Sequence, residues 1–176
     1  KMRGYFGVGV ENISKEQNVG TIARSAHSFG ASFFFTIAPD IDVRAMRQSD
    51  TSGAFDHVPY HQYESANDVA LPKGCQLVGV ELIEDSIELT SFRHPLRAAY
   101  VLGLQMVARC DHVIKIPMKF CVNVGVAAAI VMYDRMLSMG GPNGRFAPRP
   151  DTAGGPIMDA PKHVHGARRK IRTVDE

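Results

Sequence analysis

Short apolar runs that favour β-strands alternate with stretches of helical periodicity along most of this chain. The strand-like runs fall at residues 4–10, 31–38, 76–82, 98–103 and 112–116. Most are nearly continuous in apolar side chains, which is typical of strands buried on both faces of a sheet. Their alternation with helices predicts an α/β fold, in which helices cover both faces of a mostly parallel sheet.

The first helix is predicted over residues 18–29. Asn18 is a favourable residue for the N-cap, and Gly30 for the position just after the last turn. Residues 41–75 are interpreted as small helices and loops, because turn-forming and polar residues interrupt every apolar run there. We therefore predict one long helix over residues 18–29 and no strand within residues 41–75.

The composition changes after residue 139. Gly and Pro supply 11 of the last 37 residues, a fraction typical of irregular segments. This stretch also carries seven Lys/Arg against four Asp/Glu, whereas residues 1–139 carry 13 against 14. We therefore predict one domain over residues 1–139 and a Gly/Pro-rich basic extension over residues 140–176.

Several classes of protein are disfavoured. The three cysteines and seven histidines show no metal-binding spacing, and Pro59 between His57 and His61 prevents their alignment on a helix. No apolar run approaches the roughly 20 residues that a membrane helix needs, and the N-terminus lacks the apolar core of a signal peptide. Asn12 stands where a dinucleotide-binding loop needs its third glycine. We expect a soluble, cytoplasmic protein without a metal or a membrane partner.

The entry of the first helix is one candidate site. Asn18 and Gly20 lie where free backbone N–H groups favour an anion, and Arg24 follows about one turn later. An isolated arginine on a helix is more often a solvated or ion-paired residue, so the residues alone leave both interpretations open.

Residues 112–134 form the second candidate site. A strand ends at Pro117, and after a short loop a helix is predicted over residues 123–139, opening on Asn123 and small residues. Such an entry lets a ligand approach backbone donors closely. Tight packing of the helix on the sheet explains the same pattern equally well. Asp134 and Arg135 are expected on the exposed side of this helix.

Taken together, these segments resemble the SPOUT superfamily of RNA methyltransferases, in its SpoU/TrmH-type branch. The first motif, N-x-G-x-x-x-R, is present as Asn18, Gly20 and Arg24, followed by S-A-x-x-F-G-A at residues 25–31. The third motif is present as Ile116-Pro117-Met118 and Cys121-Val122-Asn123-Val124-Gly125, and a T-S-G-A element lies between the two at residues 51–54. The resemblance covers roughly residues 4–139.

The resemblance implies a Rossmann-like sheet with a C-terminal trefoil knot and a homodimer that packs the first and last helices at its interface. It also implies S-adenosylmethionine as the cofactor. Carried over by position, the cofactor-binding residues are Val80, Glu81, Gly103, Ile116, Met118, Cys121, Val122 and Asn123.

The implied reaction is methylation of a ribose 2′-hydroxyl in a structured RNA, either tRNA or rRNA. Arg24 and Asn18 are the implied catalytic residues. Arg24 is expected to bind the phosphate beside the target ribose and to stabilise the developing alkoxide, since a guanidinium rarely deprotonates. Arg24 of one subunit is expected to serve the cofactor of the other. Arg168, Arg169 and Lys170 in the basic extension are further candidates for RNA binding.

The second family motif is interrupted. About eight residues, including a glutamate, are missing between Gly103 and Gln105. The flanking elements are intact, so we expect that the protein has this loop; a true deletion would open the pocket on one side. Two other functions stay open: a non-catalytic RNA-binding relative, and a small-molecule-binding α/β domain without a role on RNA.

Overall fold

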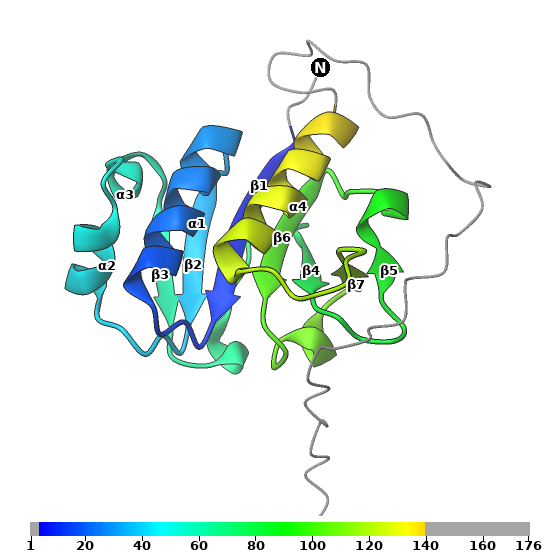
Figure 1. The fold of residues 1–176 in the computed structure, drawn as a ribbon, viewed down its shortest axis with the longest axis horizontal. Helices are drawn as coiled ribbons and strands as arrows, with labels where there is room; N and C mark the ends of the chain where they lie inside the picture. Colours follow the sequence, from blue (N-terminus) through cyan, green and yellow to red (C-terminus); the bar gives the residue numbers. More distant parts are fainter. Residues whose placement is uncertain (1–3, 140–176) are drawn as a thin grey trace, which may run out of the picture.

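The computed structural model describes residues 4–139, which form a single seven-stranded sheet. The strand order is β3-β2-β1-β6-β4-β7-β5, and every adjacent pair is parallel (Figure 1). The strands are β1 (Tyr5–Glu11), β2 (Phe33–Ile37), β3 (Tyr60–Tyr63), β4 (Gln76–Val80), β5 (Ile87–Glu88), β6 (Arg97–Leu102) and β7 (His112–Lys115). The predicted α/β class and parallel sheet are confirmed.

The α-helices of the described chain pack on one face of the sheet (Figure 1). They are α1 (Glu16–Phe29), α2 (Val43–Ser49), α3 (Ala54–His57) and α4 (Val124–Ser138), and α1 and α4 lie side by side. The 3₁₀ helix η2 (Leu89–Ser91) adds Leu89 to the same core. This core also contains Val8 and Tyr100 from the central strands.

The opposite face has a smaller apolar core around Phe33, Phe35 and Val101. It is covered by loops and by the single-turn 3₁₀ helices η1 (Ala66–Asp68) and η3 (Val107–Arg109). Within residues 4–139 the prediction of helices on both faces is therefore wrong for α-helices, because the segments on this second face are too short to form more than one turn.

The glycines of β1 have a packing role. A Cβ added at Gly7 or Gly9 would overlap the ring of Phe33 or Phe35 on the neighbouring strand. The alternation of glycine with valine in β1 therefore lets two phenylalanine rings lie flat against the sheet, and it supports the view that this stretch is no dinucleotide-binding loop.

Two predicted details of α1 have different outcomes. Gly30 ends the helix in the left-handed conformation (φ 74°), as predicted, and its N–H bonds the last turn. The N-cap prediction for Asn18 is wrong: α1 begins at Glu16 after Lys15, and Asn18 already lies in the first turn. Its side chain is thereby free to bond outside its own helix.

Two strands were not predicted. Residues 41–75 contain β3, where Pro59 and alternating polar residues conceal an edge strand, and β5 has only two residues. Both lie at the edges of the sheet. An edge strand buries less apolar surface than a central one, so its sequence shows less of the pattern that reveals a strand.

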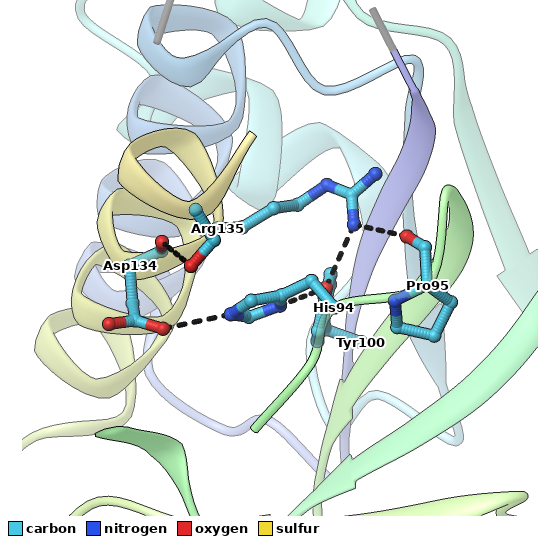
Figure 2. A network of polar contacts seen from close by, with 6 residues as sticks. His94, Pro95, Tyr100, Asp134 and Arg135 are labelled. Atoms are coloured by element: carbon cyan, nitrogen blue, oxygen red, sulfur yellow. Dashed lines mark hydrogen bonds and ion pairs between the residues drawn. The ribbon is translucent and has the colours of Figure 1, made fainter. Parts of the chain in front are cut away.

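Arg135 is buried, which corrects the expectation that it is exposed. Its side chain donates from Nη1 to the carbonyl of Pro95 (2.6 Å) and to the Tyr100 hydroxyl (3.1 Å) (Figure 2). Its guanidinium also lies over the Phe6 ring. His94 bonds Tyr100 through Nδ1 and Asp134 through Nε2 (Figure 2). This network ties α4 to the segment that enters β6, at the end of the sheet away from the carboxyl ends of the strands.

Candidate functional site

A cavity of about 390 Å³ opens at the carboxyl ends of β1, β4, β6 and β7. Ligands of parallel α/β sheets commonly bind at this edge. The cavity is lined by Val10, Glu11, Asn12, Ile13, Ser14, Lys15, Asn18, Val80, Glu81, Leu82, Leu102, Gly103, Lys115, Ile116, Met118, Cys121, Val122, Val124 and Ala127. It thus combines the loop before α1, the ends of four strands and the loop before α4.

Most of the residues predicted from the sequence to bind a cofactor meet at this cavity. The lining includes Val80, Glu81, Gly103, Ile116, Met118, Cys121 and Val122. These residues come from three loops separated by up to 42 positions in the chain. Asn123 does not line the cavity, although its neighbours Val122 and Val124 do, and its Oδ1 accepts a hydrogen bond from Gly125 N at the start of α4 (2.8 Å).

Asn18 and Asn123 bind each other. Asn123 Nδ2 donates to Asn18 Oδ1 over 2.8 Å, which links the first turn of α1 to the N-cap of α4. Both polar atoms of the Asn123 amide therefore have partners: Nδ2 bonds Asn18, and Oδ1 bonds the backbone of its own helix. The pair fixes the position of the two helix entries that border the cavity.

Gly20 and Arg24 have separate roles in the same helix. Gly20 is buried, and a Cβ there would lie 2.6 Å from the carbonyl oxygen of Ser49, so this glycine allows α2 to approach α1. Arg24 is exposed and donates from Nη2 to Thr51 Oγ1 (2.9 Å). Arg24 does not line the cavity of its own chain. The structure thus brings the predicted cofactor residues together, but not the predicted catalytic arginine.

The turn after β6 is short and continuous. Gly103 has φ 145°, and a Cβ there would overlap the Glu11 side chain, so Glu11 occupies the space beside this turn. The backbone N–H of Gln105 donates to Glu11 Oε2 (2.9 Å). The described structure thus has a short turn, anchored on Glu11, in place of the longer loop that the resemblance implies.

Glu11 is the residue of the site that sequence reasoning missed. Its side chain is only 8% exposed, and Oε1 is buried without a hydrogen-bond partner. Burial raises the pKa of Glu11, the backbone N–H groups of Gln105 and Met106 lower it, and the nearby charge of Glu81 raises it further. The sequence did contain one signal for this residue: an acidic side chain at the end of a strand of buried apolar residues.

The cavity fits a nucleoside-like cofactor with a positive charge. Apolar walls from Ile116, Val122 and Leu102 suit a purine ring, while the unpaired Oε1 of Glu11 can accept from a donor group.

Residues 4–139 contain no group of three or more His, Cys, Asp or Glu side chains placed to hold a metal ion. No helix in this part of the chain is long and apolar enough to cross a membrane. Arg168, Arg169 and Lys170 lie outside the described residues.

A parallel sheet with a cavity at its carboxyl edge defines a cofactor-binding α/β domain. The chain belongs to the SpoU rRNA Methylase family, whose model matches residues 6–133. The matched range contains every motif named from the sequence except those of the basic extension. The comparison with curated proteins gives no match.

Solved structures share this fold at low sequence identity. An rRNA methyltransferase from Sinorhizobium meliloti superposes with a TM-score of 0.66 at 19% identity, covering 77% of this chain and 56% of that one. The SpoU methyltransferase AviRb from Streptomyces viridochromogenes, in complex with AdoMet, gives 0.64 at 21% identity, covering 75% and 57%. A structure addressing the 2-OH methylation of C/U34 on tRNA gives 0.63 at 20% identity, covering 75% and 94%. This chain thus spans little more than half the length of the first two.

Proposed function

We propose that this protein is an S-adenosylmethionine-dependent RNA methyltransferase that methylates a ribose 2′-hydroxyl of tRNA or rRNA. The observation that carries the proposal is the cavity, which gathers seven residues predicted from family motifs out of three separate loops. AviRb, a neighbour in fold, is solved with AdoMet, and another neighbour concerns 2-OH methylation of tRNA. Both support the choice of cofactor and of target atom.

The residues of the cavity hold and orient the cofactor. Ile116 and Val122 supply apolar walls, and the loop before α4 offers main-chain groups to polar atoms of the ligand. When bound, the cofactor supplies a methyl group that is already activated, so alignment with the attacking oxygen is the main task of the protein. The Asn18–Asn123 pair keeps the two helix entries in register for this alignment.

Arg24 is proposed to act on the RNA. Its exposed guanidinium, oriented by Thr51, is suited to bind the phosphate beside the target ribose and to stabilise the alkoxide that forms there. Since Arg24 lies outside its own cavity, we propose that it serves the cavity of a second subunit in a homodimer. Arg168, Arg169 and Lys170 are proposed to add phosphate contacts.

The trefoil knot and the cytoplasmic location are proposed with the same function. The knot is proposed from the family to which the chain belongs. The cytoplasmic location is supported by the free thiols of Cys75, Cys110 and Cys121.

A second candidate function is binding of RNA without methyl transfer. The short turn at Gly103 favours it, because the family places a longer, glutamate-bearing loop beside the cofactor there. A small-molecule-binding domain differs from both, since only the RNA-binding candidates predict an affinity for RNA that falls steeply with salt.

The test uses cofactor labelled in its methyl group, incubated with total tRNA and rRNA. A 2′-O-methyl group blocks alkaline cleavage of the adjacent phosphodiester, so the label should appear in an alkali-resistant dinucleotide. Label in a methylated base would contradict the proposed target atom. Cofactor and RNA binding without any label transfer would favour the non-catalytic function.

A further inference from the structure

Glu11 combines two properties that rarely coexist in a residue with a purely structural role. Its carboxylate is more than nine-tenths buried, and one of its oxygens, Oε1, has no hydrogen-bond partner. A buried polar atom without a partner is destabilising, and a charged one is more so. A residue that only anchored the turn at Gln105 could do so as a glutamine, without carrying a charge into this position.

The surroundings of Glu11 hold it in place and do not neutralise it. Oε2 is fixed by the N–H of Gln105, and Gly103 leaves the space that the side chain fills. Glu81, at the end of β4, lines the same cavity and raises the pKa of Glu11 through its like charge. On the other side, burial raises the pKa of the Cys110 thiol to about 12, and the charge of Glu11 adds to this rise.

The basic side chains of the cavity do not provide the missing partner. Lys15 and Lys115 line its wall, and Lys115 Nζ donates to the carbonyl of Glu84 (3.3 Å). Neither lysine forms a hydrogen bond with Oε1 of Glu11. The cavity lining therefore includes two carboxylates, and one oxygen of the more deeply buried Glu11 has no hydrogen-bond partner; this arrangement suits a ligand with a positive charge.

We propose that Glu11 is a cofactor-binding residue whose ionised carboxylate pairs with a positive charge of the methyl donor. The inference rests on the proposed function, because it takes S-adenosylmethionine as the ligand. That molecule has two positive groups, the sulfonium and the α-ammonium, and either can satisfy the unpaired oxygen. In the free protein Oε1 stays buried without a partner, and the bound cofactor supplies one.

The experiment measures binding to the full chain by calorimetry for three ligands. S-Adenosylmethionine has both charges, S-adenosylhomocysteine lacks the sulfonium, and methylthioadenosine lacks both. Glu11→Gln keeps an oxygen to accept from Gln105 but removes the charge. We expect it to weaken S-adenosylmethionine binding about tenfold to a hundredfold while leaving methylthioadenosine binding unchanged. A parallel loss for S-adenosylhomocysteine assigns the ammonium, and an unchanged value assigns the sulfonium.

The matched control is Glu84→Gln, which removes the same charge from an exposed position outside the cavity and should leave all three affinities unchanged. Equal affinities of Glu11→Gln and the wild type for S-adenosylmethionine would overturn the inference while leaving the proposed function intact. If the wild type itself bound none of the ligands, the proposed function would fail, and the inference with it.

Stability of the free protein gives a second readout. Because the pKa of Glu11 is raised on folding, its contribution is favourable below its unfolded pKa of about 4.5 and is lost as pH rises through the folded value. Glu11→Gln should therefore unfold at the same temperature as the wild type or a few degrees higher at neutral pH. A clear drop in unfolding temperature at neutral pH would contradict the view that the Glu11 carboxylate is unfavourable in the free protein.

Discussion

At the scale of single residues, the family motifs divide into side chains that build the site and one that remains available. The side chains of Asn18 and Asn123 form a hydrogen bond with each other, and Gly20 allows the close approach of the Ser49 backbone. Arg24 alone presents its charged head to solvent, with one bond to Thr51. The motif thus combines residues that hold the fold together with one exposed guanidinium, and substitutions within it should have different consequences.

Arg24→Ala should abolish most methyl transfer without affecting cofactor binding. Loss of a donor that stabilises a developing charge typically lowers kcat about a hundredfold to a thousandfold. The dissociation constant for S-adenosylmethionine should stay within about twofold, because Arg24 does not line the cavity. Single-turnover kinetics with the labelled cofactor, beside calorimetry, check both.

Arg44→Ala is the control for Arg24, since it removes another exposed arginine from the neighbouring helix α2. It should change RNA affinity slightly and leave the rate at saturating RNA unaltered. Unchanged turnover in Arg24→Ala would contradict the proposed role of this arginine.

At the scale of elements, the sequence revealed what local periodicity encodes and missed what distant contacts decide. The central strands and α4 were predicted because each buries apolar side chains in a regular pattern. Arg135 was misjudged because its partners, Pro95 and Tyr100, are remote in the sequence, so nothing local signals that its charge is satisfied in the core.

The candidate site shows the same division. Residues in motifs, such as Ile116 and Val122, were found because they belong to a recognisable string. Glu11 was missed because its importance depends on the turn at Gly103, about 90 residues later, closing over its carboxylate. No pattern in the sequence around Glu11 indicates this contact with a distant turn.

Gly20→Ala should destabilise the fold by about 1–3 kcal/mol. Alanine favours a helix over glycine by about 1 kcal/mol, but the new Cβ would lie 2.6 Å from the backbone oxygen of Ser49 at the end of α2. Because a backbone oxygen cannot rotate away as a side chain can, α2 must shift. The cost of this shift is expected to exceed the gain in helix propensity. The free energy of unfolding in urea measures this loss.

Ser28→Ala, at an exposed position of the same helix, should leave that free energy within about 0.5 kcal/mol of the wild type. Because α2 leads directly to Thr51, Gly20→Ala should also slow methyl transfer by displacing the partner of Arg24. A variant as stable as the wild type would show that α1 and α2 can separate at no cost.

At the scale of the whole molecule, a single chain does not bring all the proposed site residues together. Its cavity lacks Arg24, and α4 exposes a stripe in which Val126 is 45% and Tyr133 50% accessible, with the partly buried Ile130 between them. The Tyr133 ring contacts Phe29 of α1, so the stripe continues onto the neighbouring helix. A second copy of the chain would cover this surface and bring its own Arg24.

Replacing both Val126 and Tyr133 by glutamate should therefore yield a monomer that has lost methyl transfer. Burying two carboxylates in an apolar interface is strongly unfavourable. Light scattering after gel filtration gives the mass. Ile87→Glu, an equally drastic change at an exposed apolar residue of the edge strand β5, should leave both the mass and the activity unaltered.

Mixing two inactive variants decides whether Arg24 acts across that interface. Arg24→Ala keeps an intact cavity, whereas Ile116→Asp keeps Arg24 but places a charge in the cavity wall. In a mixed dimer, one cavity is intact and faces an intact arginine from the other subunit. After exchange of subunits, about half of the dimers are mixed and each has one working site of two, so about a quarter of wild-type activity should return. If Arg24 served its own cavity, no combination of these two chains could contain a working site, and the mixture would stay inactive.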